Sequence, residues 1–288
     1  MTGLSRRTFL AAGVGAVVAA ACGGGGSSGG AQGSGAKASG ATALVARFQD
    51  GTFVPGAQRV AFSLGNKDGL ISDNLPATLD AEVLDANGKV VVPSVSAARH
   101  EKNLPLPYWP FGLALATPGI YTLRTTDGLE GSFSVVDPSQ EKIPKPGEKL
   151  PPFDTPTTTD GRGVNPICSR QPACPLHDIT LTQALQSGKP VAYFIGTPAF
   201  CQTGVCGPIL DFVVAQHQRL GDKMAMVHAD VYTDSTATTT TPAVNAYNMT
   251  FEPALWVADA SGTIVERLDF VFDESELTAA LAKVVPAN

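Results

Sequence analysis

Two cysteines separated by four residues form the stretch of this sequence best suited to chemistry. They are Cys201 and Cys206, in the segment FCQTGVCGP. A Cys-x-x-Cys spacing would indicate thiol–disulfide exchange. The longer spacing leaves three interpretations open: redox chemistry, metal binding, or a disulfide that only closes a loop. The sequence contains no nucleophile-elbow, HExxH, P-loop or EF-hand pattern, so it gives no support to hydrolase or nucleotide-binding functions.

The spacing restricts where the two cysteines can lie relative to a helix. Residues five apart in an α-helix differ by about 7.5 Å in rise alone, beyond the Cα–Cα range of about 4.4–6.8 Å that a disulfide prefers. A bonded pair therefore requires Cys201 in a loop, with Gly204 allowing the chain to turn back. Pro208 is favourable in a first helical turn, so the helix is predicted to begin near Cys206. Because a helix N-terminus favours thiolate, we expect Cys206 to feel it most directly and Cys201 to be more accessible.

A second cysteine pair lies upstream. Cys168 and Cys174 are separated by five residues in a proline-containing loop, and we predict a small structural disulfide between them. Together with His177 they would alternatively offer three ligands to zinc, although no fourth ligand is evident. A further alternative is electron relay between this pair and the downstream pair, which requires the loop to lie over the site.

Copper binding by the downstream pair would need a histidine placed against it. The two histidines nearest in the sequence are His217, expected in the middle of a helix, and His228, expected in a strand. Neither is an obvious third ligand, and each is predicted to be a surface or hydrogen-bonded histidine. No metal and no cofactor is therefore expected at Cys201 and Cys206.

The first residues of the chain predict export. The segment SRRTFL is a twin-arginine signal carried by Arg6 and Arg7. The apolar run from Leu10 to Ala21 is too short to span a bilayer of about 30 Å. Cys22 follows in the context VAAAC, which resembles the lipobox of bacterial lipoproteins, with Ala19 where that family usually has Leu. The resemblance implies a lipid anchor at Cys22 on the outer face of the cytoplasmic membrane. The alternative is a secreted protein that is cleaved nearby.

Composition and turn signals divide the remainder. The chain has 288 residues and a net charge of −6 with no basic stripe, which argues for two domains and against nucleic-acid binding. Residues 23–42 form a Gly/Ser tether, and residues 138–178 a proline-rich, extended connector. Residues 43–137 are predicted to form an all-β sandwich, because Asn87-Gly88 and Asp127-Gly128 are hairpin signals. The stretch PGIYTLRTTDG within it resembles bacterial immunoglobulin-like domains. His100 is expected on its surface.

Residues 179–288 show an α/β pattern. Thr180 and Gln183 form a capping box for a first helix. The expected elements that follow are a strand over 191–195, a helix continuing to Leu220, a strand over 224–231, a hairpin over 254–265 and a final helix from Ser275. Between the second strand and the hairpin the sequence is polar, and no element is predicted there.

This order resembles the thioredoxin-like fold, and more narrowly the membrane-anchored thioredoxin-domain proteins of actinobacterial type. The likeness rests on PVAYFIG leading to Cys201, on PILD in the helix, and on NMTFEPALWV followed by Ser261-Gly262. It implies that Pro253 is the cis-proline opposite the cysteines and that Glu252 precedes it. Two positions depart from the family: Tyr193 stands where a buried Asp relays protons, and Phe200 where Trp is usual. By this likeness Cys201 is the attacking thiol and Cys206 the resolving thiol, an order that the helix argument could reverse.

The sequence therefore favours an extracytoplasmic thiol–disulfide oxidoreductase that acts through Cys201 and Cys206 by way of a mixed disulfide. Its partner would be a protein thiol or disulfide. Glu252 and Pro253 would line the site and pair with the backbone of this partner. Its sandwich domain would be a spacer or a docking module. The alternative is a redox-inert module of the same fold that binds a partner through the Pro253 groove, with both cysteine pairs as structural disulfides.

Overall fold

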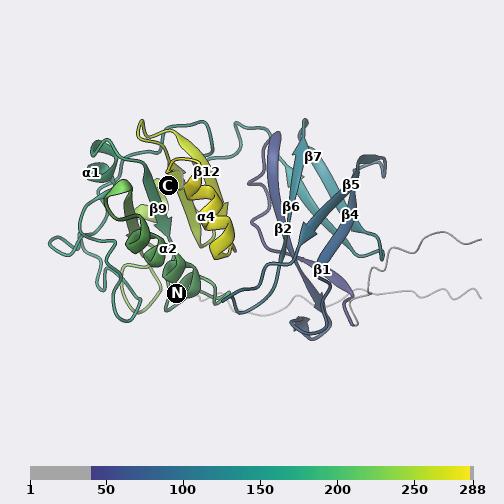
Figure 1. Ribbon diagram of the computed structural model, residues 1–288, viewed down its shortest axis with the longest axis horizontal. Helices are drawn as coiled ribbons and strands as arrows, with labels where there is room; N and C mark the ends of the chain where they lie inside the picture. The colour runs from purple at the N-terminus through teal and green to yellow at the C-terminus, as the bar shows by residue number, and fades with distance from the viewer. Residues whose placement is uncertain (1–39, 286–288) are drawn as a thin grey trace, which may run out of the picture. The chain divides into compact units, whose positions relative to one another are not determined.

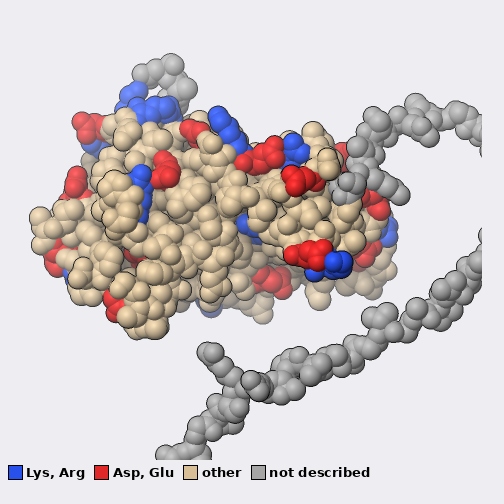
Figure 2. Space-filling view, turned by 90° about the horizontal axis from the view of Figure 1, so that it is seen from below, with Lys and Arg blue, Asp and Glu red and all other residues tan. Residues whose placement is uncertain are grey.

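A computed structural model describes residues 40–285, so the predictions for Arg6, Arg7 and Cys22 concern residues outside this range. The described residues form one compact unit. In the described range β-strands predominate and helices are few, with eight strands first and a mixed α/β segment after them (Figure 1). None of the helices in this range is both long and apolar enough to cross a membrane. Figure 2 shows acidic and basic side chains mixed over the visible face.

The first eight strands form two antiparallel sheets that share one core. The first sheet has the order β1-β2-β3, with β6 also paired to β2, and the second has the order β5-β4-β7-β8. The large side chains of Phe62 and Trp109 from one sheet meet those of Tyr121 and Phe133 from the other, which confirms the all-β prediction. The strands are β1 (Ala43–Ala46), β2 (Gly56–Asn66), β3 (Gly69–Leu70), β4 (Thr78–Asp85), β5 (Val90–Ala98), β6 (Trp109–Leu115), β7 (Gly119–Thr125) and β8 (Glu130–Val135).

The second part of the chain is built on a four-stranded mixed sheet of order β10-β9-β11-β12. Strands β9 and β10 are parallel, and β11 is antiparallel to both of its neighbours. The prediction of two strands and a hairpin is confirmed, and the short helix α3 was not predicted. The elements are α1 (Leu181–Gln186), β9 (Val191–Ile195), α2 (Cys206–Leu220), the 3₁₀ turn η1 (Gly221–Lys223), β10 (Ala225–Ala229), α3 (Pro242–Ala246), β11 (Ala254–Ala258), β12 (Ile264–Asp269) and α4 (Glu274–Ala282).

Helices cover both faces of this sheet, which explains why β9 and β11 are buried along their whole length. Alternate residues of a strand point to opposite faces. Phe194 of β9 and Leu255 of β11 belong to the core that contains the buried sides of α2 and α4. Tyr193 and Trp256 belong to the core that contains α1 and α3. Figure 1 shows α2 and α4 as neighbours, and their side chains are joined by a hydrogen bond from Gln216 to Thr278.

The connector over residues 138–178 contains no helix or strand, as predicted, but it packs closely against the rest of the chain. Ile143 and Leu150 are buried in the core on the α1 side of the sheet. The backbone N–H of Leu150 donates to the carbonyl of Gly262, and the carbonyl of Leu176 accepts from the N–H of His228. The connector was predicted to be extended and not to pack, and the second part of this prediction is wrong, because its apolar residues are buried in the core.

His100 is not an isolated surface residue as predicted. It lies in the loop before β6, is only partly exposed, and its Nδ1 lies 2.9 Å from Oδ2 of Asp273. Asp273 is also the N-cap of α4. The neighbouring Glu276 forms an ion pair with Arg59 of β2 and accepts a hydrogen bond from Tyr108. The eight-stranded part and α4 are thus joined by a half-buried polar network.

Candidate functional site

The helix α2 begins at Cys206, where the spacing argument placed it. Cys201 lies in the preceding loop and is bonded to Cys206, with the two Cα atoms 6.0 Å apart. Gly204 has the left-handed φ of +69° that the turn requires. Cys206 is fully buried, whereas Cys201 is partly exposed. Any substrate must therefore reach the sulfur of Cys201 first, as predicted from its position outside the helix.

The sulfur of Cys201, rather than that of Cys206, receives the hydrogen bonds at the start of α2. The backbone N–H of Cys206 donates to Sγ of Cys201 at 3.4 Å. The hydroxyl of Thr203 lies 3.3 Å from the same sulfur. The expectation that Cys206 would feel the helix N-terminus most directly is wrong, because the loop folds Cys201 over the open end of the helix. Donors at this point favour a thiolate on Cys201 when the pair is reduced.

Glu252 lies beside the buried cysteine. Its Oε2 is 3.5 Å from Sγ of Cys206 and accepts a hydrogen bond of 2.6 Å from the backbone N–H of Thr197. Burial raises the pKa of Glu252 to about 7, against the opposing effect of the Thr197 N–H and with a contribution from the charge of Asp230. A carboxyl with this pKa can take up or release a proton near neutral pH.

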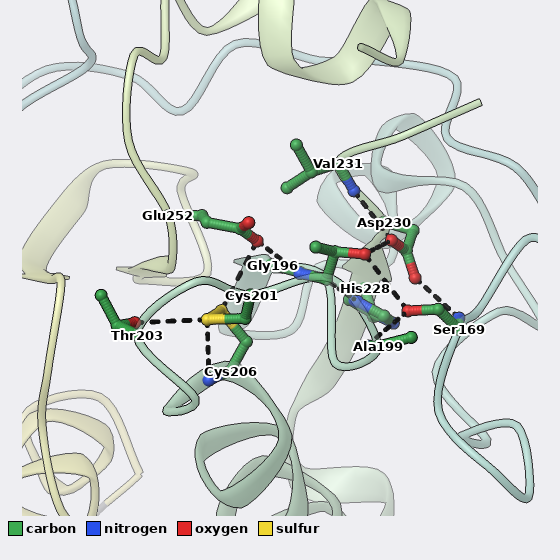
Figure 3. The surroundings of a disulfide bond; sticks show 11 residues. Ser169, Gly196, Ala199, Cys201, Thr203, Cys206, His228, Asp230, Val231 and Glu252 are labelled. Atoms are coloured by element: carbon green, nitrogen blue, oxygen red, sulfur yellow. Dashed lines mark hydrogen bonds between the residues drawn. A yellow bond between two sulfur atoms is a disulfide. The ribbon is translucent and has the colours of Figure 1, made fainter. Parts of the chain in front are cut away.

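Pro253 closes the site on the side facing the loop after β9. The Glu252–Pro253 peptide bond is cis, as the family resemblance implied. A Cβ on Gly196 would lie 3.2 Å from Cβ of Pro253 and 2.8 Å from the ring of Phe194. The absence of a side chain at Gly196 thus lets the end of β9 approach Pro253. Figure 3 shows Glu252 and the cysteine pair on one side of this loop, with His228 and Ser169 on the other.

The two positions that depart from the family lie away from the disulfide chemistry. Tyr193 is buried on the α1 side of the sheet, where its ring stacks on Trp256, whereas Cys206 belongs to the core on the α2 side. Tyr193 therefore lies on the opposite face of the sheet from Cys206. Phe200 precedes Cys201 and packs edge-on against Tyr232 at a centroid distance of 6.1 Å. Glu252 is the carboxyl that lies within reach of Cys206.

A groove runs beside the exposed side of Cys201. Its walls include Cys201, Gln202, Tyr232, Met249, Phe251 and Phe270. Phe251 and Phe270 stack at a centroid distance of 5.8 Å. Glu252 also lines this groove. An accessible sulfur thus lies beside apolar and aromatic walls.

The upstream cysteines are not joined in the structure, so the predicted disulfide between Cys168 and Cys174 is not present. Both are buried free thiols. His177 lies with them, and His228, which the sequence gave no reason to place there, reaches the same cluster from β10. His217 stays on α2 outside this cluster, as expected. The only signals available for His228 were its residue type and its place in an apolar strand, and neither indicates a partner.

A scan against protein-family models and a search of curated proteins give no match to this chain.

Proposed function

We propose that this chain is an extracytoplasmic thiol–disulfide oxidoreductase, with a thioredoxin-like domain over residues 179–288 that acts through Cys201 and Cys206. The observation that carries the proposal is that the two sulfurs of the pair have different surroundings. One sulfur is accessible and faces hydrogen-bond donors at a helix N-terminus. The other is buried beside a carboxyl whose pKa is about 7. A disulfide that only closes a loop needs neither feature.

The proposed exchange proceeds through a mixed disulfide and is reversible. In the oxidising direction, a substrate thiolate attacks Sγ of Cys201 and forms a bond to it. The Cys201–Cys206 bond breaks, and Cys206 leaves as a thiolate that takes a proton from Glu252. A second substrate thiolate then attacks the substrate sulfur bonded to Cys201, releasing Cys201 as a thiolate. Two electrons pass from the substrate, which gains a disulfide, to the cysteine pair.

The reducing direction uses the same groups in the opposite order. Cys201 thiolate attacks a substrate disulfide and expels one substrate sulfur. Glu252, when ionised, accepts the proton of Cys206, and the Cys206 thiolate then attacks Cys201 and releases the second substrate sulfur. Because Cys206 is buried, it reaches Cys201 but not the substrate, which supports Cys201 as the attacking and Cys206 as the resolving thiol.

The groove supports a protein partner. We propose that an extended segment of the partner binds against Phe251 and the cis-Pro253, which brings its cysteine to the exposed sulfur of Cys201. The immunoglobulin-like sandwich would then act as a spacer or a docking module. Export through Arg6 and Arg7 and lipidation at Cys22 would hold the protein at the outer face of the cytoplasmic membrane.

Trapping of mixed disulfides tests the enzymatic proposal. In Cys206→Ser the resolving thiol is absent, so partner proteins should accumulate as covalent adducts on Cys201. In Cys201→Ser the remaining thiol is buried, and few or no adducts should form. Adducts on Cys201→Ser alone would reverse the two roles, and adducts on neither variant would argue for the redox-inert binding module. A reduction potential well below about −300 mV would also indicate a structural bridge.

A further inference from the structure

Four buried side chains from two distant parts of the sequence converge behind the cysteine loop. Cys168, Cys174 and His177 come from the connector, and His228 comes from the edge strand β10. Their exposed fractions are 2%, 5%, 1% and 0%. One nitrogen or sulfur atom of each lies within 4.8 Å of those of the others. Two thiols and two imidazoles that face one another in this way are a common set of ligands for a metal ion.

The distances between these atoms match a tetrahedral zinc site. From Nδ1 of His228, the structure gives 3.1 Å to Nε2 of His177, 3.4 Å to Sγ of Cys174 and 3.8 Å to Sγ of Cys168. Zinc–nitrogen bonds of about 2.0–2.1 Å and zinc–sulfur bonds of about 2.3 Å at tetrahedral angles separate two nitrogens by about 3.3 Å and a nitrogen from a sulfur by about 3.6 Å.

Hydrogen bonding alone leaves this cluster poorly satisfied. Nε2 of His228 lies 2.9 Å from the carbonyl oxygen of Gly196, an acceptor, so this nitrogen carries the proton. Nδ1 of His228 then carries one lone pair and no proton. His177, Cys174 and Cys168 all point toward this lone pair. Only one of the three can donate to it fully. A cation at the centre would instead accept a lone pair from each of the four side chains.

Hydrogen bonds that would support metal ligands from outside are present for His228 and for the sulfur of Cys168. The Gly196 carbonyl fixes both the tautomer and the ring orientation of His228, as carbonyls commonly do for ligating histidines. The backbone N–H of Cys174 donates to Sγ of Cys168 at 3.4 Å, which stabilises charge on that sulfur. With four protein ligands and full burial, the site has no open position for substrate, which is typical of structural rather than catalytic zinc.

We propose that Cys168, Cys174, His177 and His228 bind one zinc ion. The ligand atoms are the two Sγ atoms, Nε2 of His177 and Nδ1 of His228. The ion ties the connector to the edge strand β10 and keeps two neighbouring thiols from oxidising to a disulfide. This site is separate from Cys201 and Cys206, and the inference does not depend on their redox activity.

The zinc site would also position the loop that carries Cys201. Ser169 follows the ligand Cys168, and its N–H donates to Oδ2 of Asp230 at 2.7 Å. The hydroxyl of Ser169 accepts from the backbone N–H of Ala199 at 3.2 Å. Ala199 lies two residues before Cys201. Figure 3 shows this chain of contacts running from Asp230 through Ser169 to Ala199. Removal of the ion would free Cys168, and the position of the adjacent Ser169 would then no longer be fixed.

Metal analysis of the purified full-length chain tests the proposal. The wild type, produced with zinc in the medium, should contain about one zinc per chain. His228→Gln and Cys174→Ser should each lower zinc affinity at least about tenfold in competition with a chromogenic chelator. His217→Gln, which changes the histidine outside the cluster, is the matched control and should retain full zinc content. Cobalt should give the visible absorption of a tetrahedral site with thiolate ligands in the wild type and in the control only.

A second measurement uses the wild type alone, so that it does not depend on variants that fail to fold. Cys168 and Cys174 should resist alkylation in the native protein and react once a chelator is added, as followed by peptide mass mapping. A Cys168–Cys174 disulfide in the purified protein, stoichiometric copper in place of zinc, alkylation that is indifferent to the chelator, or full zinc content in His228→Gln would each overturn the proposal.

Discussion

The carboxyl of Glu252 lies 3.5 Å from the sulfur of Cys206, the fully buried cysteine of the disulfide. Cys206 comes from the start of α2, and Glu252 from the segment that precedes β11. This contact brings a proton donor or acceptor to the cysteine that no substrate can reach. In the proposed exchange, charge stabilisation would fall to Cys201 and proton transfer to Cys206.

Replacement of Glu252 by Gln should slow the step in which Cys206 attacks or leaves. The amide keeps the shape of the carboxyl but cannot exchange a proton. We expect a loss of about 10- to 100-fold in the rate of disulfide exchange near neutral pH. The wild-type rate should show an inflection near pH 7, where the Glu252 carboxyl titrates, and this inflection should be absent in the variant. Stopped-flow exchange with a small disulfide across a range of pH measures both.

The same carboxyl should also affect stability, with a defined sign. Its pKa in the folded protein, about 7, lies above the ordinary value of 4.5. Between these two values the folded state binds more protons than the unfolded state, so the stability contributed by this group falls as pH rises. Glu252→Gln should remove that fall. Glu130→Gln, which changes an exposed carboxyl on β8, is the matched control and should keep the wild-type dependence of both rate and stability on pH.

In the reduced protein the thiol of Cys201 should be more acidic than that of Cys206. The N–H of Cys206 and the hydroxyl of Thr203 both face its sulfur, whereas Cys206 is buried beside a carboxyl. We expect Cys201 to be alkylated at least about ten times faster than Cys206 at neutral pH. Thr203→Val removes one donor and should slow the alkylation of Cys201 at neutral pH. Peptide mapping of alkylated cysteines gives the order, and equal rates for the two thiols would contradict it.

Gly196→Ala should disturb both the site and the fold. The new methyl group would lie 2.8 Å from the ring of Phe194 and 3.2 Å from Cβ of Pro253, and both of these side chains are buried. We expect a loss of about 1–3 kcal/mol in the free energy of unfolding, together with slower exchange. Gly207→Ala is the control, because a Cβ there meets nothing within 4 Å. Since Gly207 lies in the first turn of α2, its replacement should be neutral or stabilising by up to about 1 kcal/mol. Denaturant unfolding of the two variants checks the difference.

Local features of the sequence predicted local structure well. The capping box of Thr180 and Gln183 is present at α1, because both of its hydrogen bonds are made within one turn. The start of α2 at Cys206 followed from the rise of a helix and from Pro208 alone. The helix α3 was missed although Thr241-Pro242 is a reasonable start signal, because five residues in a polar stretch give no periodicity to recognise.

The contacts that complete the Cys201–Cys206 site and the proposed zinc site depend on tertiary structure. His228 joins Cys168 only because β10 pairs in parallel with β9 and the connector covers its free edge. A sequence separation of 60 residues offers no pattern by which to predict this. Likewise the donors to Cys201 arise from the fold of the loop over α2, and this reversed the expected effect of the helix on the two thiols. Residue types predicted the chemistry available, and packing decided which atoms meet.

The ion pair of His100 and Asp273 should make stability depend on pH in a bell-shaped manner. The hydrogen bond to Asp273 raises the pKa of His100, against the effect of burial and with Glu276 favouring and Arg59 opposing the charged form. The pKa of Asp273 is lowered, because its bonds to His100, Ser275 and Glu276 outweigh the desolvation that opposes them. His100 therefore stabilises the fold fully below its ordinary value of 6.5 and loses this effect as pH rises through its raised pKa. Asp273 contributes above 3.8 and loses its effect as pH falls through its lowered pKa.

His100→Gln keeps the N-cap of α4 intact and removes only the charged partner. We expect it to cost about 1–2 kcal/mol at about pH 5, where both groups are ionised, and clearly less at about pH 9, where the imidazole is neutral in the wild type as well. His217→Gln is the matched control and should show no such difference between the two pH values. Urea unfolding at each pH measures the effect. A cost that is equal at both would mean that His100 acts through packing against Tyr108, at a centroid distance of 5.3 Å, rather than through its charge.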